Sequence, residues 1–118
     1  MKIAAVLLCA ILLFPAAGCG SMPVRAQQEI AIAPSRVHED CMEIKKGERL
    51  VYSFQASQLL SFNLHYHDDS HITYAIEKEN VRESSGTYRA EKDQYYCLMW
   101  TNPQKEEAQI TYTYSVEK

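Results

Sequence analysis

The feature that most constrains the fold is a two-residue alternation of apolar and polar side chains that recurs along the chain. From Glu39 onward, five runs carry aliphatic or aromatic residues at every second position. This period is typical of β-strands, and no window shows a convincing helical stripe. The apolar positions are Leu50, Tyr52 and Phe54; Phe62, Leu64 and Tyr66; Ile72, Tyr74 and Ile76; Tyr96, Leu98 and Trp100; and Ile110, Tyr112, Tyr114 and Val116.

Turn-like segments separate these runs. "KKGE" precedes the first run, and "QASQ", "DDS", "ENVRESSG" and "TNPQKEE" lie between the others. A helical turn near Gln55–Gln58 is a further possibility. Several short strands at this spacing predict an all-β fold, a small antiparallel β-sandwich. The run around Trp100 is apolar on both faces, so we expect a central strand that is covered on both sides.

The N-terminus resembles an export signal. Lys2 supplies a positive charge, unbroken apolar sequence runs from Ile3 to Phe14, and the small residues of "PAAG" follow. The apolar run is shorter than the roughly 20 residues that span a bilayer. We therefore predict that residues 1–18 are a signal peptide that is absent from the mature protein.

Two cleavage sites compete at the end of this signal. "AAGC", which ends at Cys19, resembles the lipobox of bacterial lipoproteins, although Ala16 replaces the usual leucine. The alternative is "VRA", an ordinary signal-peptidase site that would be cut after Ala26 and give a soluble periplasmic or secreted protein. We favour the first site. Acyl chains on Cys19 would anchor the protein without spanning the membrane. By the same resemblance, Gly20 and Ser21 suggest the outer membrane of a bacterial envelope, with the protein facing the periplasm.

Length and charge limit the organisation of the mature chain. About 100 residues follow the lipobox, enough for one domain with one core. Residues 19–38 contain prolines and small polar residues and are predicted to be a tether, in which "EIAIA" could form a short edge strand. The domain is expected over residues 39–118. The formal net charge of −3 argues against nucleic acid as a partner.

Cysteine usage indicates one disulfide. The chain has four cysteines; Cys9 leaves with the signal peptide, and Cys19 is either lipidated or removed. Cys41 and Cys97 remain in both cases, and a disulfide is the default in an oxidising compartment. Closing so long a loop would stabilise the domain by about 4 kcal/mol. We expect the bond to cross between sheets. A two-thiol metal or redox site is the alternative, but no C-x-x-C spacing supports it.

The order of several segments resembles a GOLD-type domain. These segments are "CMEIKKGERLVYSF", "SFNLHYH", "GTYRA" and "YYCLMWTN", which span roughly Glu39 to Glu117. In Golgi cargo receptors with this domain, a β-sandwich carries a disulfide between an early and a late strand, which Cys41 and Cys97 would match. The resemblance implies a sandwich that binds proteins or lipids and catalyses nothing. An immunoglobulin-like or jelly-roll sandwich is the alternative, although the order of Cys and Trp does not fit immunoglobulins.

The stretch "FNLHYHDDSHITY" holds three of the four histidines. A three-residue loop, Asp68-Asp69-Ser70, would join two strands into a tight hairpin. In that register His67 faces His71 at about 5 Å between Cβ atoms. His65 lies on the same face, about 7 Å along the strand. The opposite face is expected to face the core and carries Phe62, Leu64, Tyr66, Ile72, Tyr74 and Ile76.

Such a cluster could bind zinc or copper. His65, His67 and His71 would be the ligands, with Asp68 or Asp69 as a further one. The alternatives are a plain polar sheet surface or a pH-dependent binding patch, since imidazoles titrate near neutral pH.

No sequence motif indicates catalysis. The serines lie outside G-x-S-x-G and S-x-x-K motifs, and neither a P-loop nor a G-x-G-x-x-G occurs. Tyr95 is a possible exposed ligand contact. The leading hypothesis is therefore a non-catalytic, lipid-anchored envelope module that binds a protein or lipid partner and needs no cofactor. The alternative is a periplasmic metal-binding protein that uses the histidines.

Overall fold

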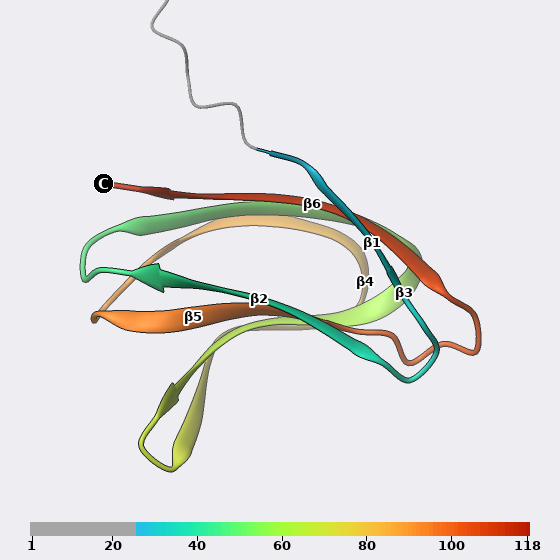
Figure 1. Ribbon diagram of the computed structural model, residues 1–118, viewed down its shortest axis with the longest axis horizontal. Coiled ribbons are helices and arrows are strands. Elements are labelled where there is room, and N and C mark those ends of the chain that lie inside the picture. The colour runs from blue at the N-terminus through green and yellow to red at the C-terminus, as the bar shows by residue number, and fades with distance from the viewer. Residues whose placement is uncertain (1–25) are drawn as a thin grey trace, which may run out of the picture.

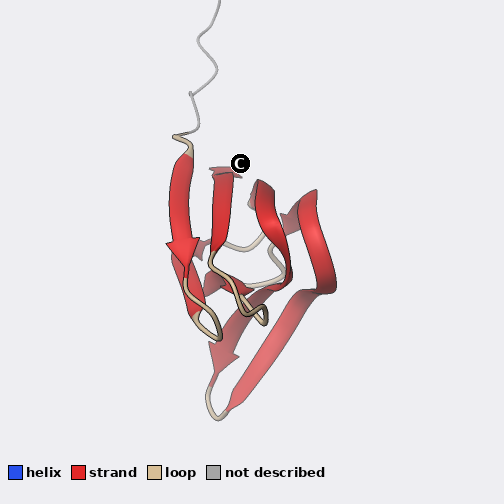
Figure 2. Ribbon diagram, turned by 90° about the vertical axis from the view of Figure 1, so that its right-hand side faces the viewer, coloured by secondary structure: helices blue, strands red, loops and turns tan. Residues whose placement is uncertain are grey.

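The computed structural model describes residues 26–118, which form six β-strands (Figures 1 and 2). All strand pairs are antiparallel, so the predicted all-β antiparallel class is confirmed. The described range contains no helix that could cross a membrane. The predicted signal peptide, Cys19 and residues 19–25 of the tether lie outside the described residues. The strands are β1 (Gln28–Ile32), β2 (Val37–Ile44), β3 (Arg49–Asp68), β4 (His71–Arg89), β5 (Gln94–Thr101) and β6 (Ala108–Glu117).

One continuous sheet folds over on itself to make the two halves of the sandwich. Its strand order is β1-β6-β3-β5-β2, and β4 pairs with the other edge of β3. The first part of β3 pairs with β6 at 49–56, and the later part pairs with β5 at 61–66. Because β3 and β4 bend together, β1 and β6 come to lie over β2 and β5 (Figure 1).

β3 and β4 are longer than the sequence pattern predicted. The segments "QASQ" and "ENVRESSG", which were expected to be turns, lie within β3 and β4, and Gln55–Gln58 is strand instead of a helical turn. The pairing register shifts between Gln55 and Leu60, and Asn80 adopts a left-handed backbone conformation with φ of 54°. These irregularities bend the two strands without ending them.

The sheet begins before the predicted start of the domain at Glu39. β1 lies within the predicted tether and pairs with β6 from Gln28–Tyr112 to Ile32–Ala108, so "EIAIA" does contribute an edge strand. Ile32 is buried in the core and Ile30 packs against it. This burial explains why the segment belongs to the domain.

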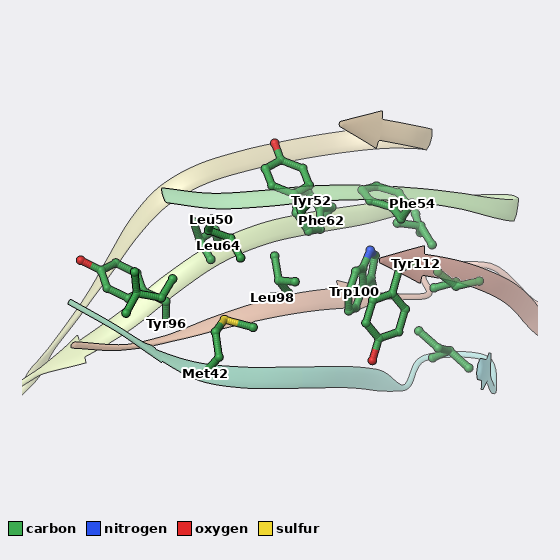
Figure 3. Packing of buried hydrophobic residues seen from close by; sticks show 14 of the residues in the cluster. Met42, Leu50, Tyr52, Phe54, Phe62, Leu64, Tyr96, Leu98, Trp100 and Tyr112 are labelled. Carbon is green, nitrogen blue, oxygen red and sulfur yellow. The ribbon is translucent and has the colours of Figure 1, made fainter. Parts of the chain in front are cut away.

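The core lies between the two halves of the folded sheet (Figure 3). Its centre is aromatic: the ring centroids are 4.7 Å apart for Phe54 and Phe62, 5.8 Å for Phe54 and Trp100, and 4.5 Å for Trp100 and Tyr112. Such pairs add about 0.5–1.5 kcal/mol each beyond the burial of area. The predicted inward positions of β3, β5 and β6 are mostly buried, which confirms the two-residue pattern there.

A polar contact joins the two halves beside this core. The Tyr112 hydroxyl donates to Asp40 Oδ2 at 2.7 Å, and the Tyr114 hydroxyl donates to Oδ1 at 3.4 Å. Asp40 lies on β2 and the tyrosines on β6. Burial, assisted by the bond to Asp40, raises the pKa of Tyr112. The neutral phenol therefore persists well above neutral pH, and both tyrosines face inward as predicted.

Candidate functional site

Cys41 and Cys97 form a disulfide, as the cysteine arithmetic predicted. The expected geometry was wrong in one respect, because the bond does not cross between the halves of the sandwich. The two residues are direct partners in neighbouring strands β2 and β5, with Cα atoms 4.0 Å apart. Met42 and Leu98, the next residues along each strand, point into the core. The disulfide therefore lies on the outer face of the sheet.

The register of the β3–β4 hairpin differs from the predicted one. The loop contains two residues, Asp69 and Ser70, and Asp68 pairs with His71. His67 consequently pairs with Ile72, so the predicted opposition of His67 and His71 was wrong. Asp69 has a φ of 50°, a left-handed conformation that suits two-residue hairpin loops.

The shift separates the predicted metal ligands onto two faces. His65 and His67 share the outer face, with ring centroids 5.3 Å apart. Asp68 and His71 lie on the opposite face, because neighbouring strand residues alternate. Within residues 26–118, no three His, Cys, Asp or Glu side chains are grouped so that they could hold a metal ion. The arrangement predicted for zinc or copper is thus not formed.

The outer face of β2, β5, the later part of β3 and the start of β4 forms a continuous surface, which we call the histidine face. The pairing register places side chains in rows across these four strands. Two successive rows run Cys41, Cys97, His65, Tyr74 and Glu39, Met99, Asn63, Glu77. The whole face comprises Val37, Glu39, Cys41, Glu43, Ser61, Asn63, His65, His67, Ile72, Tyr74, Glu77, Glu79, Tyr95, Cys97, Met99 and Thr101.

His65 is buried at the centre of this face, with 3% of its surface exposed. Asn63 Oδ1 lies 2.7 Å from its Nδ1, and Glu39 Oε1 lies 3.3 Å from its Nε2. The His67 ring packs edge-on against the imidazole and the Tyr74 ring packs against it at a tilt. Burial lowers the pKa of His65; Glu39 opposes this shift and His67 adds to it. The imidazole is therefore neutral at neutral pH, and both of its nitrogens lie within reach of polar groups.

Protonation of His65 should destabilise the fold. Its unfolded pKa of about 6.5 exceeds the folded one, so the unfolded state binds more protons below that pH. The contribution of His65 to stability is complete above pH 6.5 and falls as the pH drops, by up to about 1.4 kcal/mol per pH unit. Urea unfolding between pH 7.5 and 5 should show this slope in the wild type and in the control His71→Gln, an exposed residue on the opposite face of the hairpin. His65→Gln should have a flatter slope, and equal slopes in all three proteins would contradict the assignment.

Large apolar side chains are exposed around His65. Tyr95 is 64% exposed, Ile72 48% and Tyr74 46%. Ile72 and Tyr74 were predicted to face the core. Both instead lie near the end of the hairpin, which projects beyond the rest of the sandwich (Figure 1). Tyr95 was predicted to be exposed, and it is. Together with Met99 and the disulfide, these residues form an apolar and aromatic area of the kind that marks interaction sites.

The projecting hairpin is held from its other face. Lys92 Nζ, from the loop between β4 and β5, lies 2.5 Å from Asp68 Oδ2 and 4.8 Å from the centroid of the Tyr66 ring. Tyr66 in turn packs edge-to-face with buried Tyr96, with ring centroids 5.2 Å apart. These contacts fix the angle of the hairpin, so the histidine face is presented by an ordered element.

Several members of the face were not predicted as site residues, namely Glu39, Glu43, Asn63, Ile72, Tyr74, Glu77 and Met99. The signal that could have found them is the cysteine pair. If Cys41 and Cys97 are placed directly opposite each other in antiparallel strands, Glu39 is opposite Met99 and Glu43 is opposite Tyr95. Joining Tyr95 to the histidines also requires the pairing of β5 with β3, which places His65 opposite Cys97.

No protein-family model and no curated protein matches this chain. Its fold is similar to that of solved β-domains. The periplasmic inhibitor of g-type lysozyme PliG from Aeromonas hydrophila superposes with a TM-score of 0.62 and 10% identity, covering 79% of this chain and 86% of that one. The chain's sandwich-type fold is thus confirmed, and the narrower GOLD assignment stays a prediction.

Two further structures have the same type of fold. The pre-peptidase C-terminal domain of a Bacillus anthracis collagenase gives a TM-score of 0.58 at 15% identity, covering 79% of this chain and 89% of that one. The Yersinia pseudotuberculosis-derived mitogen gives 0.57 at 10%, covering 82% and 89%. At these identities the likeness concerns the fold alone.

Proposed function

We infer that this chain is a non-catalytic, lipid-anchored module of a bacterial cell envelope that binds a protein partner through its histidine face. The observation that carries this proposal is the exposure of Tyr95, Tyr74 and Ile72 on one face of an ordered sheet. Protein interfaces are enriched in such aromatic residues, which bury a large area at a small cost in side-chain entropy.

The position of the face favours a protein over the membrane as its partner. Figures 1 and 2 both place the end of the β3–β4 hairpin far from the start of β1, at the opposite end of the described domain. The segment that carries an acyl anchor on Cys19 would connect to the sheet at Gln28, the first residue of β1. The hairpin and its exposed apolar residues would then point away from the lipid surface.

Export and the structural comparison support the same proposal. The apolar segment from Ile3 to Phe14 and the lipobox at Cys19 predict transport to the envelope. The Aeromonas hydrophila protein of similar fold is a periplasmic inhibitor, and an inhibitor of an enzyme acts by binding a protein. A lysozyme is therefore the first candidate to compare with any partner that is found.

Site-specific photocrosslinking in intact cells tests this function. A photoreactive phenylalanine analogue at Tyr95 should give a discrete protein adduct, because this side chain is the most exposed aromatic of the face. The same analogue at Thr113, on the outer face of β6, is the matched control, and we expect at least a tenfold lower yield there. The adduct should sediment with membranes in the wild type and become soluble in a Cys19→Ser variant.

Each outcome of this experiment decides a part of the proposal. Equal yields at the two positions, or no adduct at Tyr95, would overturn the histidine face as the binding surface. Adducts with lipid alone would assign the face to the membrane instead. Membrane sedimentation that persists in Cys19→Ser would remove the lipid anchor and leave the binding function intact.

A further inference from the structure

The histidine face has an uneven distribution of charge. It contains four glutamates and neither lysine nor arginine. The glutamates lie in two pairs, Glu39 with Glu43 on β2 and Glu77 with Glu79 on β4. β2 and β4 are the two edge strands of this half of the sandwich. Acidic margins therefore flank a central strip of exposed apolar and aromatic side chains.

These carboxylates are only partly neutralised by the protein itself. Glu43 pairs with Lys45, which follows β2, at 2.5 Å. Glu79 accepts a hydrogen bond from Ser61, and Glu39 lies beside the neutral His65. Within residues 26–118, the side chain of Glu77 makes no hydrogen bond or ion pair. The face therefore carries a net negative charge at neutral pH.

The outer face of the other half provides a contrast. Two shallow grooves there are lined mainly by short uncharged side chains on β3, β4 and β6. Among the residues that line them, Glu83 alone carries a charge. The pairing register also places Glu29, Glu83 and Glu117 on this outer face, together with Arg49 and Arg89. Its formal charge is therefore −1, against −4 for the histidine face, so the excess of unbalanced carboxylates is a property of the histidine face.

We propose that the histidine face binds a basic surface of its protein partner. The partner's lysine and arginine side chains would lie along the two acidic margins, and its apolar side chains would pack against Tyr95, Met99 and Tyr74. This inference rests on the proposed function and names the chemical class of the partner. Complementary charges at the edge of an interface steer association and exclude partners of the wrong sign. An anionic membrane surface is repelled by the same carboxylates.

The test uses the crosslinking position Tyr95 in intact cells, combined with charge variants. The first variant is Glu43→Gln/Glu77→Gln/Glu79→Gln, which spares Glu39 because that residue contacts buried His65. The matched control is Glu83→Gln/Glu91→Gln/Glu107→Gln, which changes the net charge equally at exposed positions outside the face. Loss of the three margin charges should lower the crosslinking yield about tenfold. Each exposed ion pair contributes modestly, and the three contributions add.

We expect the first variant to lose about nine tenths of the adduct and the control to keep it. Mass spectrometry of the wild-type adduct should place the crosslink next to lysine or arginine residues of the partner. Equal yields in the two variants, or a crosslinked segment rich in Asp and Glu, would overturn the basic partner while leaving the binding function in place. Absence of an adduct in the wild type would overturn both. Unfolding midpoints of the variants, which should match the wild type, exclude misfolding as the cause.

Discussion

Replacing Cys41 and Cys97 together by alanine should lower the free energy of unfolding by about 4 kcal/mol. The two residues are separated by 56 positions, so their bond removes much of the freedom of the unfolded chain. The native contacts around them should persist, because the sulfurs lie on the outer face and β2 pairs with β5 along its whole length. Guanidinium unfolding of the oxidised wild type and the double variant measures the difference.

Two comparisons sharpen this test. Wild type reduced by dithiothreitol should unfold at the same midpoint as the double variant, since both lack the covalent loop. A loss below about 1 kcal/mol would contradict the argument from the unfolded state. A single Cys41→Ala variant leaves Cys97 as a free thiol, so dimers linked through that cysteine should be sought in its preparation.

Asn102→Ala should cost about 3 kcal/mol or more in unfolding free energy. The Asn102 side chain has no exposed surface, and its Nδ2 donates to the carbonyls of Ile32 and Glu106 at 2.9 and 2.8 Å. Its Oδ1 accepts a bond from the backbone N–H of Gln104. Alanine would leave these three backbone groups without their partner, and each such group costs about 1–3 kcal/mol when it stays buried.

The control for Asn102 lies in the same loop. Gln104→Ala removes a side-chain bond to the carbonyl of Leu59 at an exposed position and should cost less than 1 kcal/mol. Asn102→Asp keeps the shape but replaces the amide donor by a carboxylate facing two carbonyls, and should be at least as harmful as alanine. Urea unfolding of all four proteins gives the order. If Asn102→Ala and Gln104→Ala cost the same, the loop is held by other contacts.

The strands could be predicted from the sequence because each buries one face. Leu50, Tyr52 and Phe54 alternate with exposed or half-buried residues as expected. The extent of β3 and β4 could not be predicted, because their middle parts carry polar residues that resemble turns. There β3 changes its partner from β6 to β5 and both strands bend, a tertiary effect that a local pattern does not contain.

The error at the histidines has a simple physical origin. A hairpin loop of two residues in place of three shifts the pairing by one, and a shift of one moves a side chain to the other face of the sheet. His71 therefore lies on the face opposite to that of His65 and His67. The burial of His65 could not be predicted from the local sequence either. Its surroundings include Glu39, which comes from a strand that is distant along the chain.

Among the strands of residues 26–118, β4 pairs with β3 alone, so these strands leave one long edge of the sheet open along 19 residues. Such an edge is a template on which a second chain could add a strand and start aggregation. Here the middle of β4 carries the charged residues of "EKENVRE" and the left-handed Asn80, which interrupt a regular ladder of free backbone groups. The chain can thus expose a long edge strand beside its apolar face and still resist self-association by strand addition.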